Sequence, residues 1–160
     1  MSSHSVELAE FYVIGIAERT SNRREITGEG IIGRQWARLF AEGLLRQIPN
    51  REDSDIVAVY ADYAGDHTSE YTFLLGARVS SIVPVPEGMV AKRIPAARYS
   101  VVTSERGPVQ QVVVAAWQKI WSMSAEELGG ERAFLADFEV YGAEASDPQN
   151  AQVRIFVGLK

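Results

Sequence analysis

The feature that most constrains this fold is a pattern that occurs twice at a constant spacing. The segment WARLF, which begins at Trp36, resembles WQKIW, which begins at Trp117: both read tryptophan, any residue, base, aliphatic, aromatic. The same number of residues then leads from Trp36 to Tyr60 and from Trp117 to Tyr141. Two amphipathic helices can resemble each other by chance, but chance does not explain the equal spacing. The pattern therefore predicts an internal duplication of one supersecondary unit.

Each unit is expected to contain a strand, a helix and two further strands. Extended runs rich in β-branched and aromatic residues alternate with helical stripes that carry the two tryptophans. The expected fold class is α+β: two β-α-β-β units form one antiparallel sheet, with two main helices on one face and a ligand groove between them. The units cover about residues 11–79 and 97–160, and the proline-marked segment 80–96 is expected to be their linker. The polar stretch 21–30 is expected to be a loop.

Composition limits the class of protein. The chain has 160 residues and is 46% hydrophobic, which suffices for one compact domain over 1–160. It contains no cysteine, so disulfides, thiolate metal sites and cysteine nucleophiles are excluded. No apolar run approaches the roughly 18 residues that span a membrane, and the polar start does not resemble a signal peptide. A cytoplasmic location without a membrane partner is therefore expected.

The charge of the chain bears on its partners. The net charge is −5, whereas proteins that bind nucleic acid nonspecifically carry a basic surface. Direct nucleic-acid binding is therefore not expected. Acidic residues concentrate between positions 124 and 150, where Arg132 is the one base. This region is either an acidic solvated loop or a field that attracts cations.

Glu139 is the candidate binding residue that the duplication singles out. Aligning the two units places the small apolar Ala58 opposite Glu139, and Tyr60 opposite Tyr141. Because side chains alternate along a strand, Glu139 and Tyr141 share one face. A carboxylate among aromatic side chains is costly to bury unless a cation pairs with it, and aromatic faces also attract cations. Glu139 is therefore either the counter-ion of a bound organic cation or a carboxylate that faces solvent or forms a hydrogen bond with a neighbouring backbone group or tyrosine hydroxyl.

The aromatic residues of the two helices and their neighbouring strands are the candidate walls of the groove. Such residues belong to the core by default, although a tryptophan can contact core and groove together. The candidate ligand-binding set besides Glu139 is Trp36, Phe40, Tyr60, Phe73, Trp117, Trp121 and Tyr141.

Other motifs carry little functional signal. The run GEGIIG at 28–33 fits a glycine-rich nucleotide loop, but no strand leads directly into it. His4 and His67, the two histidines, lie in an expected frayed tail and a turn, without a second ligand at metal spacing. We therefore expect no metal, no cofactor and no catalytic residues.

From Phe11 to Lys160 the chain resembles the GyrI-like effector-binding domain of AraC-type and MerR-type regulators. The segments that carry the resemblance are FYVIGIAERT, the Trp36 helix, YTFLLGARV, VPEGMVAKRIPAARYSVVTSERGPV, the Trp117 helix and FEVY. In that family, a glutamate in an F-E-x-Y strand motif lies at the base of the pocket and meets cationic ligands, and Glu139 matches this position. Among stand-alone members, the chain is most similar to effector-binding proteins encoded on integron cassettes.

The resemblance implies binding of small amphipathic or aromatic organic cations by a drug sensor or a sequestering protein. The regulators carry a helix-turn-helix domain beside this module, for which the expected elements leave no room. A protein partner, as in topoisomerase inhibition, would use the acidic region 124–150. A hydrolase of reactive small molecules is a further alternative, with Glu139 as general base beside a tyrosine. A homodimer through an exposed sheet edge is also compatible with the sequence.

Overall fold

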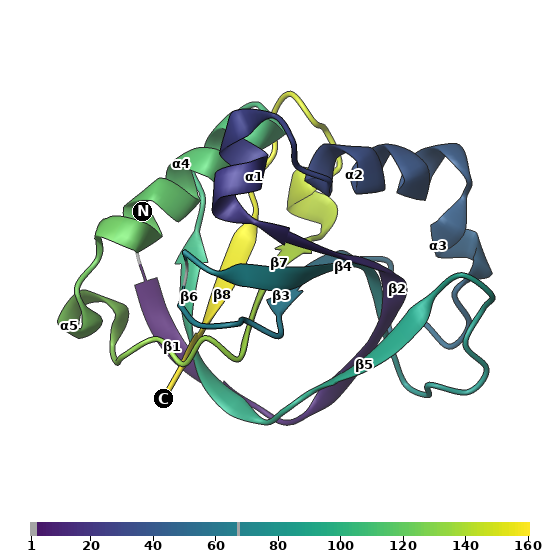
Figure 1. Ribbon diagram of the computed structural model, residues 1–160, viewed down its shortest axis with the longest axis horizontal. Coiled ribbons are helices and arrows are strands. Elements are labelled where there is room, and N and C mark those ends of the chain that lie inside the picture. The colour runs from purple at the N-terminus through teal and green to yellow at the C-terminus, as the bar shows by residue number, and fades with distance from the viewer. Residues whose placement is uncertain (1–2, 67) are drawn as a thin grey trace.

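Figure 1 presents the computed structural model of the chain, which describes residues 3–66 and 68–160. The described strands form one antiparallel sheet in the order β1-β6-β8-β7-β3-β4-β2-β5. The strands are β1 (Ser3–Leu8), β2 (Phe11–Ser21), β3 (Ile56–Ala61), β4 (Glu70–Val79), β5 (Val90–Ile94), β6 (Ala97–Thr103), β7 (Ala136–Tyr141) and β8 (Arg154–Leu159). His67 lies outside the described residues.

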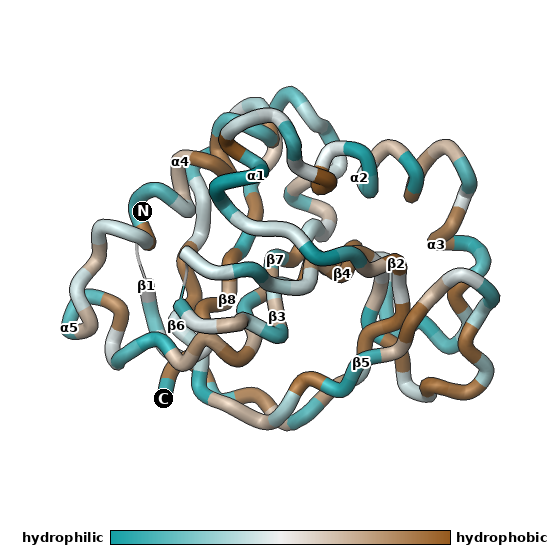
Figure 2. Tube along the Cα trace, viewed as in Figure 1, coloured by the Kyte–Doolittle hydropathy of each residue, from teal (hydrophilic) through white to brown (hydrophobic). Residues whose placement is uncertain are grey.

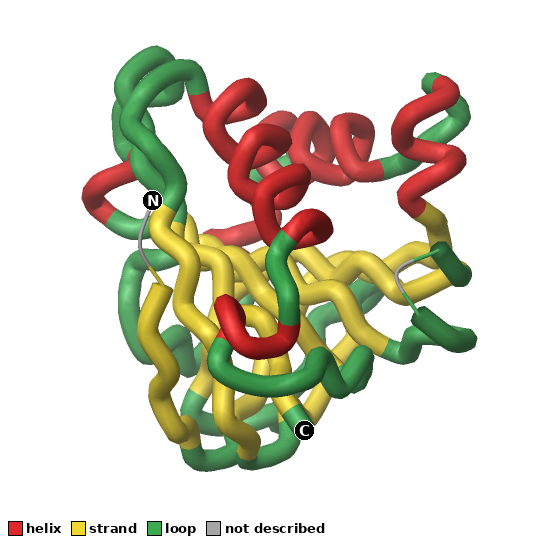
Figure 3. The backbone as a smooth tube through the Cα atoms, turned by 90° about the vertical axis from the view of Figure 1, so that its left-hand side faces the viewer, coloured by secondary structure: helices red, strands yellow, loops and turns green. Residues whose placement is uncertain are grey.

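The helices are few and short. They are α1 (Asn22–Thr27), α2 (Ile32–Ala41), α3 (Leu44–Gln47), α4 (Val109–Ser122) and α5 (Ala125–Leu128), with a 3₁₀ turn, η1 (Ala143–Ala145). The two longest, α2 and α4, lie on the same side of the sheet, as Figures 1 and 3 show from two directions. Among the described residues, no helix combines the length and apolar character needed to cross a bilayer.

The α+β fold with duplicated units is confirmed. The first unit is β2-α2-β3-β4 and the second is β6-α4-β7-β8, and in each the strand order is the same. The equivalent strands β3 and β7 pair with each other at the centre of the sheet. The two halves are therefore related by a pseudo-twofold axis that passes between β3 and β7.

Two strands lie outside the expected units. The N-terminal tail, expected to be frayed at His4, forms β1 and pairs with β6, and residues 90–94 of the expected linker form β5 and pair with β2. Each of these strands precedes one repeat and pairs with the other, so they occupy equivalent opposite edges of the sheet. The repeated unit thus begins one strand earlier than the helix pattern indicated.

The expected loop 21–30 contains the helix α1. The side chain of Ser21 accepts a hydrogen bond from the backbone N–H of Arg24, and Gly28 ends the helix with φ of 86°. Serine at the N-cap and glycine after the last turn are standard helix boundaries. The helix has no buried residue, which explains why an apolar stripe did not reveal it.

The sheet curls so that its two faces both enclose apolar residues. Phe11 of β2 packs against Phe138 of β7 with ring centroids 5.1 Å apart, although β4 and β3 separate these strands in the sheet. Gly15 and Gly76 pair where β2 crosses β4, and a Cβ on either would overlap a carbonyl oxygen of the partner strand. Figure 2 shows hydrophobic residues recurring along the strands. The core thus forms a floor beneath the two helices.

Candidate functional site

The pseudo-twofold axis passes between Glu139 and Ala58. The direct partner of Glu139 across the β3–β7 ladder is Ala58, which is also the residue that the duplication aligns with it. Directly opposed side chains of an antiparallel pair have Cβ atoms about 5 Å apart. Two carboxylates at these equivalent positions would repel each other, whereas alanine leaves room for one. The structure thus has a single negative charge at the centre of the floor.

The carboxylate of Glu139 is buried and held by three hydrogen bonds. Its side chain lies on the helix side of the sheet, and the residue is 1% exposed. Its Oε1 accepts a hydrogen bond from the hydroxyl of Tyr141 at 2.6 Å. Its Oε2 accepts one from the hydroxyl of Tyr60 at 2.8 Å and one from the indole N–H of Trp117 at 2.6 Å. Oε1 therefore has one protein donor fewer than Oε2.

Burial and hydrogen bonding act in opposite directions on this group. Burial raises the pKa of Glu139, and the hydrogen bonds from Tyr141, Trp117 and Tyr60 reduce that increase. Burial, together with the negative charge of Glu139, raises the pKa of both Tyr60 and Tyr141 well above the usual tyrosine range. Both hydroxyls are consequently protonated donors. Within the described residues, no basic side chain forms an ion pair with Glu139.

Asp137, two residues earlier on the same face of β7, provides a contrast. It is fully buried, and Arg132 donates to its Oδ2 at 2.7 Å. The hydroxyl of Tyr63 and the backbone N–H of Gly158 complete its hydrogen bonds at 2.6 and 2.7 Å. The guanidinium also lies 4.4 Å from the centroid of the Phe134 ring. Among the described residues, Arg132 thus supplies a cation for Asp137, whereas no basic side chain does so for Glu139.

This contrast changes the interpretation of the acidic segment 124–150. Asp137 and Glu139 contribute to its acidity in the sequence, but both are buried beneath the helices. The segment is therefore less acidic on the surface than its composition indicated.

A cavity of about 1310 Å³ opens above Glu139, between α2 and α4. Seven of the eight predicted site residues line it: Trp36, Phe40, Tyr60, Trp117, Trp121, Glu139 and Tyr141. Phe73 does not. It is fully buried, and its ring packs edge-on against that of Tyr60, its direct partner on β3, with ring centroids 5.4 Å apart. Phe73 is thus a core residue, and its assignment to the groove wall is corrected.

The rim of the cavity is apolar and exposed. Phe40 is 64% exposed, Val114 54% and Trp121 40%, and all three line the opening. Monomeric domains seldom expose several large apolar side chains around one cavity. The cavity therefore combines a charged floor with apolar upper walls.

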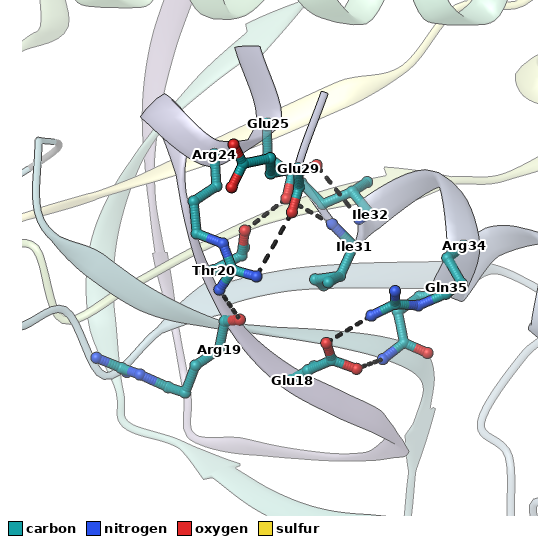
Figure 4. A network of polar contacts seen from close by, with 10 residues as sticks. All are labelled: Glu18, Arg19, Thr20, Arg24, Glu25, Glu29, Ile31, Ile32, Arg34 and Gln35. Atoms are coloured by element: carbon teal, nitrogen blue, oxygen red, sulfur yellow. Dashed lines mark hydrogen bonds and ion pairs between the residues drawn. The ribbon is translucent and has the colours of Figure 1, made fainter. Parts of the chain in front are cut away.

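Helix α1 supplies wall residues that the sequence did not reveal. Asn22, Glu25 and Ile26 line the cavity, and Ile26 is 77% exposed. Figure 4 shows how Glu25 ties this helix to the start of α2: its carboxylate accepts from the backbone N–H of Ile31 at 2.8 Å and from the hydroxyl of Thr20 at 2.5 Å. These bonds also complete the N-terminus of α2, which lacks a side-chain cap of its own.

Tyr63, Tyr71 and Arg132 also line the cavity without having been predicted. The two tyrosines lie on or beside the strands β3 and β4, and their rings are 5.6 Å apart. Alternation along β4 places Tyr71 on the same face as Phe73, so its inward direction could have been inferred. Nothing in the sequence pattern indicates that Arg132 reaches the floor, because it lies in an irregular segment before β7.

Comparisons with known proteins agree with this architecture. The chain is 34% identical over 161 residues to the putative transcriptional regulator protein YobU of Bacillus subtilis (strain 168), covering 99% of this chain and 98% of that protein. The integron cassette protein VCH_CASS2, from the mobile metagenome of Vibrio cholerae, superposes with a TM-score of 0.75 at 24% identity, covering 99% and 96% of the two chains. The structure of SAV2435 bound to tetraphenylphosphonium superposes with a TM-score of 0.79 at 15% identity, covering 100% and 94%. These two likenesses establish the fold.

The family assignment rests on two sequence matches. The family described as integron-associated effector binding protein (Cass2) matches residues 6–159, which include both repeats, the C-terminal half of β1, the edge strand β5, and Glu139. With that match and the similarity to YobU over nearly the whole of both chains, the protein belongs to the integron-associated effector binding protein family.

Proposed function

We propose that this protein binds amphipathic or aromatic organic cations in the cavity between α2 and α4, with Glu139 as their counter-ion. The observation that carries the proposal is a buried carboxylate with three hydrogen-bond donors and no cationic partner among residues 3–66 and 68–160, facing a cavity of about 1310 Å³. A buried charge is stable in proteins when it is paired, as Asp137 is with Arg132. A cationic ligand would complete the same arrangement at Glu139.

The cavity walls favour cations that are also apolar. Trp36 packs edge-on against Tyr141, and Trp117 against Tyr60, so aromatic rings surround the carboxylate. Aromatic faces stabilise cations by roughly 0.5–2 kcal/mol each, and exposed apolar side chains at the rim favour hydrophobic substituents. The structural relative SAV2435 was determined with tetraphenylphosphonium, a cation of this class. The family description, effector binding, is compatible with a stand-alone sensor or a sequestering protein without catalysis.

The sign of the ligand charge tests this proposal directly. Tetraphenylphosphonium and tetraphenylborate have nearly the same shape and opposite charge. We expect isothermal titration calorimetry to give saturable binding of the phosphonium and affinity at least about 100-fold lower for the borate, because like charges in a buried site cost several kcal/mol. Equal affinities would indicate an apolar cavity in which the carboxylate has no role, and would overturn the proposal.

Cation binding should also depend on pH through Glu139. Because burial raises the pKa of Glu139, the carboxyl takes up a proton at a higher pH than an ordinary glutamate. A permanent cation binds the ionised form, so its affinity should fall as the pH decreases through that pKa, approaching about tenfold per pH unit below it. Tryptophan-fluorescence titration with a quaternary ammonium ion, which does not itself titrate, measures this dependence. The Glu139→Gln variant serves as control and should show a flat profile; a flat profile in the wild type would contradict the assignment.

A further inference from the structure

The walls that α2 and α4 contribute to the cavity repeat on either side of the pseudo-twofold axis. Every residue of α2 that lines the cavity has its repeat equivalent on α4 lining it too. The equivalent pairs are Ile32 and Val113, Gly33 and Val114, Trp36 and Trp117, and Phe40 and Trp121. The duplication therefore extends beyond the backbone to the side chains of α2 and α4 that line the cavity.

The aromatic contacts at the floor repeat in the same way. Trp36 of the first repeat packs on Tyr141 of the second, with ring centroids 4.7 Å apart at 71°. Trp117 of the second repeat packs on Tyr60 of the first, at 5.3 Å and 67°. Each helix thus covers the tyrosine of the other repeat, and each tyrosine donates to one oxygen of the same carboxylate.

Glu139 adds a carboxyl group at the centre of this repeated arrangement, because it lies opposite its own equivalent, Ala58. A charge beside the twofold axis lies midway between the two helices, and the apolar residues of α2 and of α4 extend from it on either side. A ligand whose charge lies at one end would cover the wall on one side and leave the other in contact with water.

We infer that the ligands of this cavity carry their positive charge centrally, between two apolar arms of similar size. This inference rests on the proposed function and specifies its ligand class: symmetric onium-type or diaryl cations rather than single-chain cations with a terminal charge. Burial of apolar surface on both sides of the charge is the physical cause of the preference.

Two isomeric cations separate these possibilities. Dihexyldimethylammonium and undecyltrimethylammonium have the same atoms and the same charge, but the charge is central in the first and terminal in the second. Calorimetric titration should give an affinity about tenfold or more higher for the dihexyl isomer than for the undecyl isomer. Each buried methylene contributes a similar amount to the binding free energy, and only the dihexyl isomer can place an alkyl chain on both sides of the charge. Equal affinities, or tighter binding of the undecyl isomer, would overturn the inference.

The equivalent rim residues Phe40 and Trp121 provide matched variants. Both are substantially exposed, so Phe40→Ala and Trp121→Ala should leave the fold intact, which thermal unfolding can verify. Each variant should lower the affinity for the dihexyl isomer by a similar factor, about three- to tenfold. A loss of affinity in only one of the two variants would indicate that the ligand contacts only one helix, and would overturn the inference.

Glu139→Gln separates this inference from the proposed function. If both isomers bind equally and both lose affinity in this variant, the central-charge inference fails and the proposed function stands. If the affinity of both isomers is unchanged in this variant, the central-charge inference and the proposed function both fail.

Discussion

Replacing Glu139 by glutamine is expected to lower the affinity for tetraphenylphosphonium by about 100-fold or more. Removing one member of a desolvated charge pair typically costs 2–5 kcal/mol of binding free energy. Glutamine has the same shape and can still accept from Tyr60 and Trp117, so the walls should keep their positions. Calorimetry on wild type and variant at one ionic strength measures the difference.

Asp55 provides the matched control for this loss of charge. It also lines the cavity, but it lies 3.8 Å from Arg78 and its side chain is 23% exposed. Asp55→Asn removes the same formal charge from a carboxylate that already has a basic neighbour, so a change below about threefold is expected. Comparable losses in both variants would attribute the effect to the general negative potential of the protein and not to Glu139.

Replacing Asp137 by asparagine is expected to reduce the free energy of unfolding by about 3–5 kcal/mol, because Arg132 would then be buried without its partner. The side chain of Arg132 is 10% exposed, so water can replace little of the lost interaction. Urea unfolding monitored by circular dichroism measures the change. The double variant Asp137→Asn, Arg132→Met should recover part of the loss, since it removes both members of the pair.

Glu139→Gln should have the opposite effect on stability in the absence of ligand. The pKa of Glu139 is higher in the folded protein than in the unfolded chain. Its protonation therefore stabilises the fold fully at pH values below the pKa in the unfolded chain, and this stabilisation is lost as the pH rises through the pKa in the folded protein. At neutral pH the amide variant should therefore be as stable as the wild type or more so. Equal destabilisation by Asp137→Asn and Glu139→Gln would mean that Glu139 has a structural partner like that of Asp137.

The sequence predicted the central part of the fold better than its edges. The equal spacing from each tryptophan to its tyrosine identified the duplication, and alternation along FEVY placed Glu139 and Tyr141 on one face. The strands β1 and β5 were missed because each contributes only a short half-polar run whose pairing lies in the other repeat. Such long-range pairing leaves no local periodicity to detect.

The sequence likewise placed part of the candidate site and missed other parts of it. Alternation and helical spacing are local properties, and they correctly brought the aromatic residues of α2 and α4 above Glu139. They did not distinguish Phe73, which is fully buried against Tyr60, from Tyr71 on the same face of β4, which lines the cavity. Nor could they show that Arg132 turns toward Asp137, because the segment between α5 and β7 is irregular. The difference between the two carboxylates of β7 therefore emerged only from the structure.

A crystal structure of the complex with tetraphenylphosphonium would test the central claim most directly, with the phosphorus located by anomalous scattering. We expect the phosphorus on the pseudo-twofold axis, between Trp36 and Trp117 and within about 6 Å of the Glu139 carboxylate. A cation bound elsewhere would contradict it, for example in the smaller cavity of about 360 Å³ beside α5, which is lined by Met123 and Leu128.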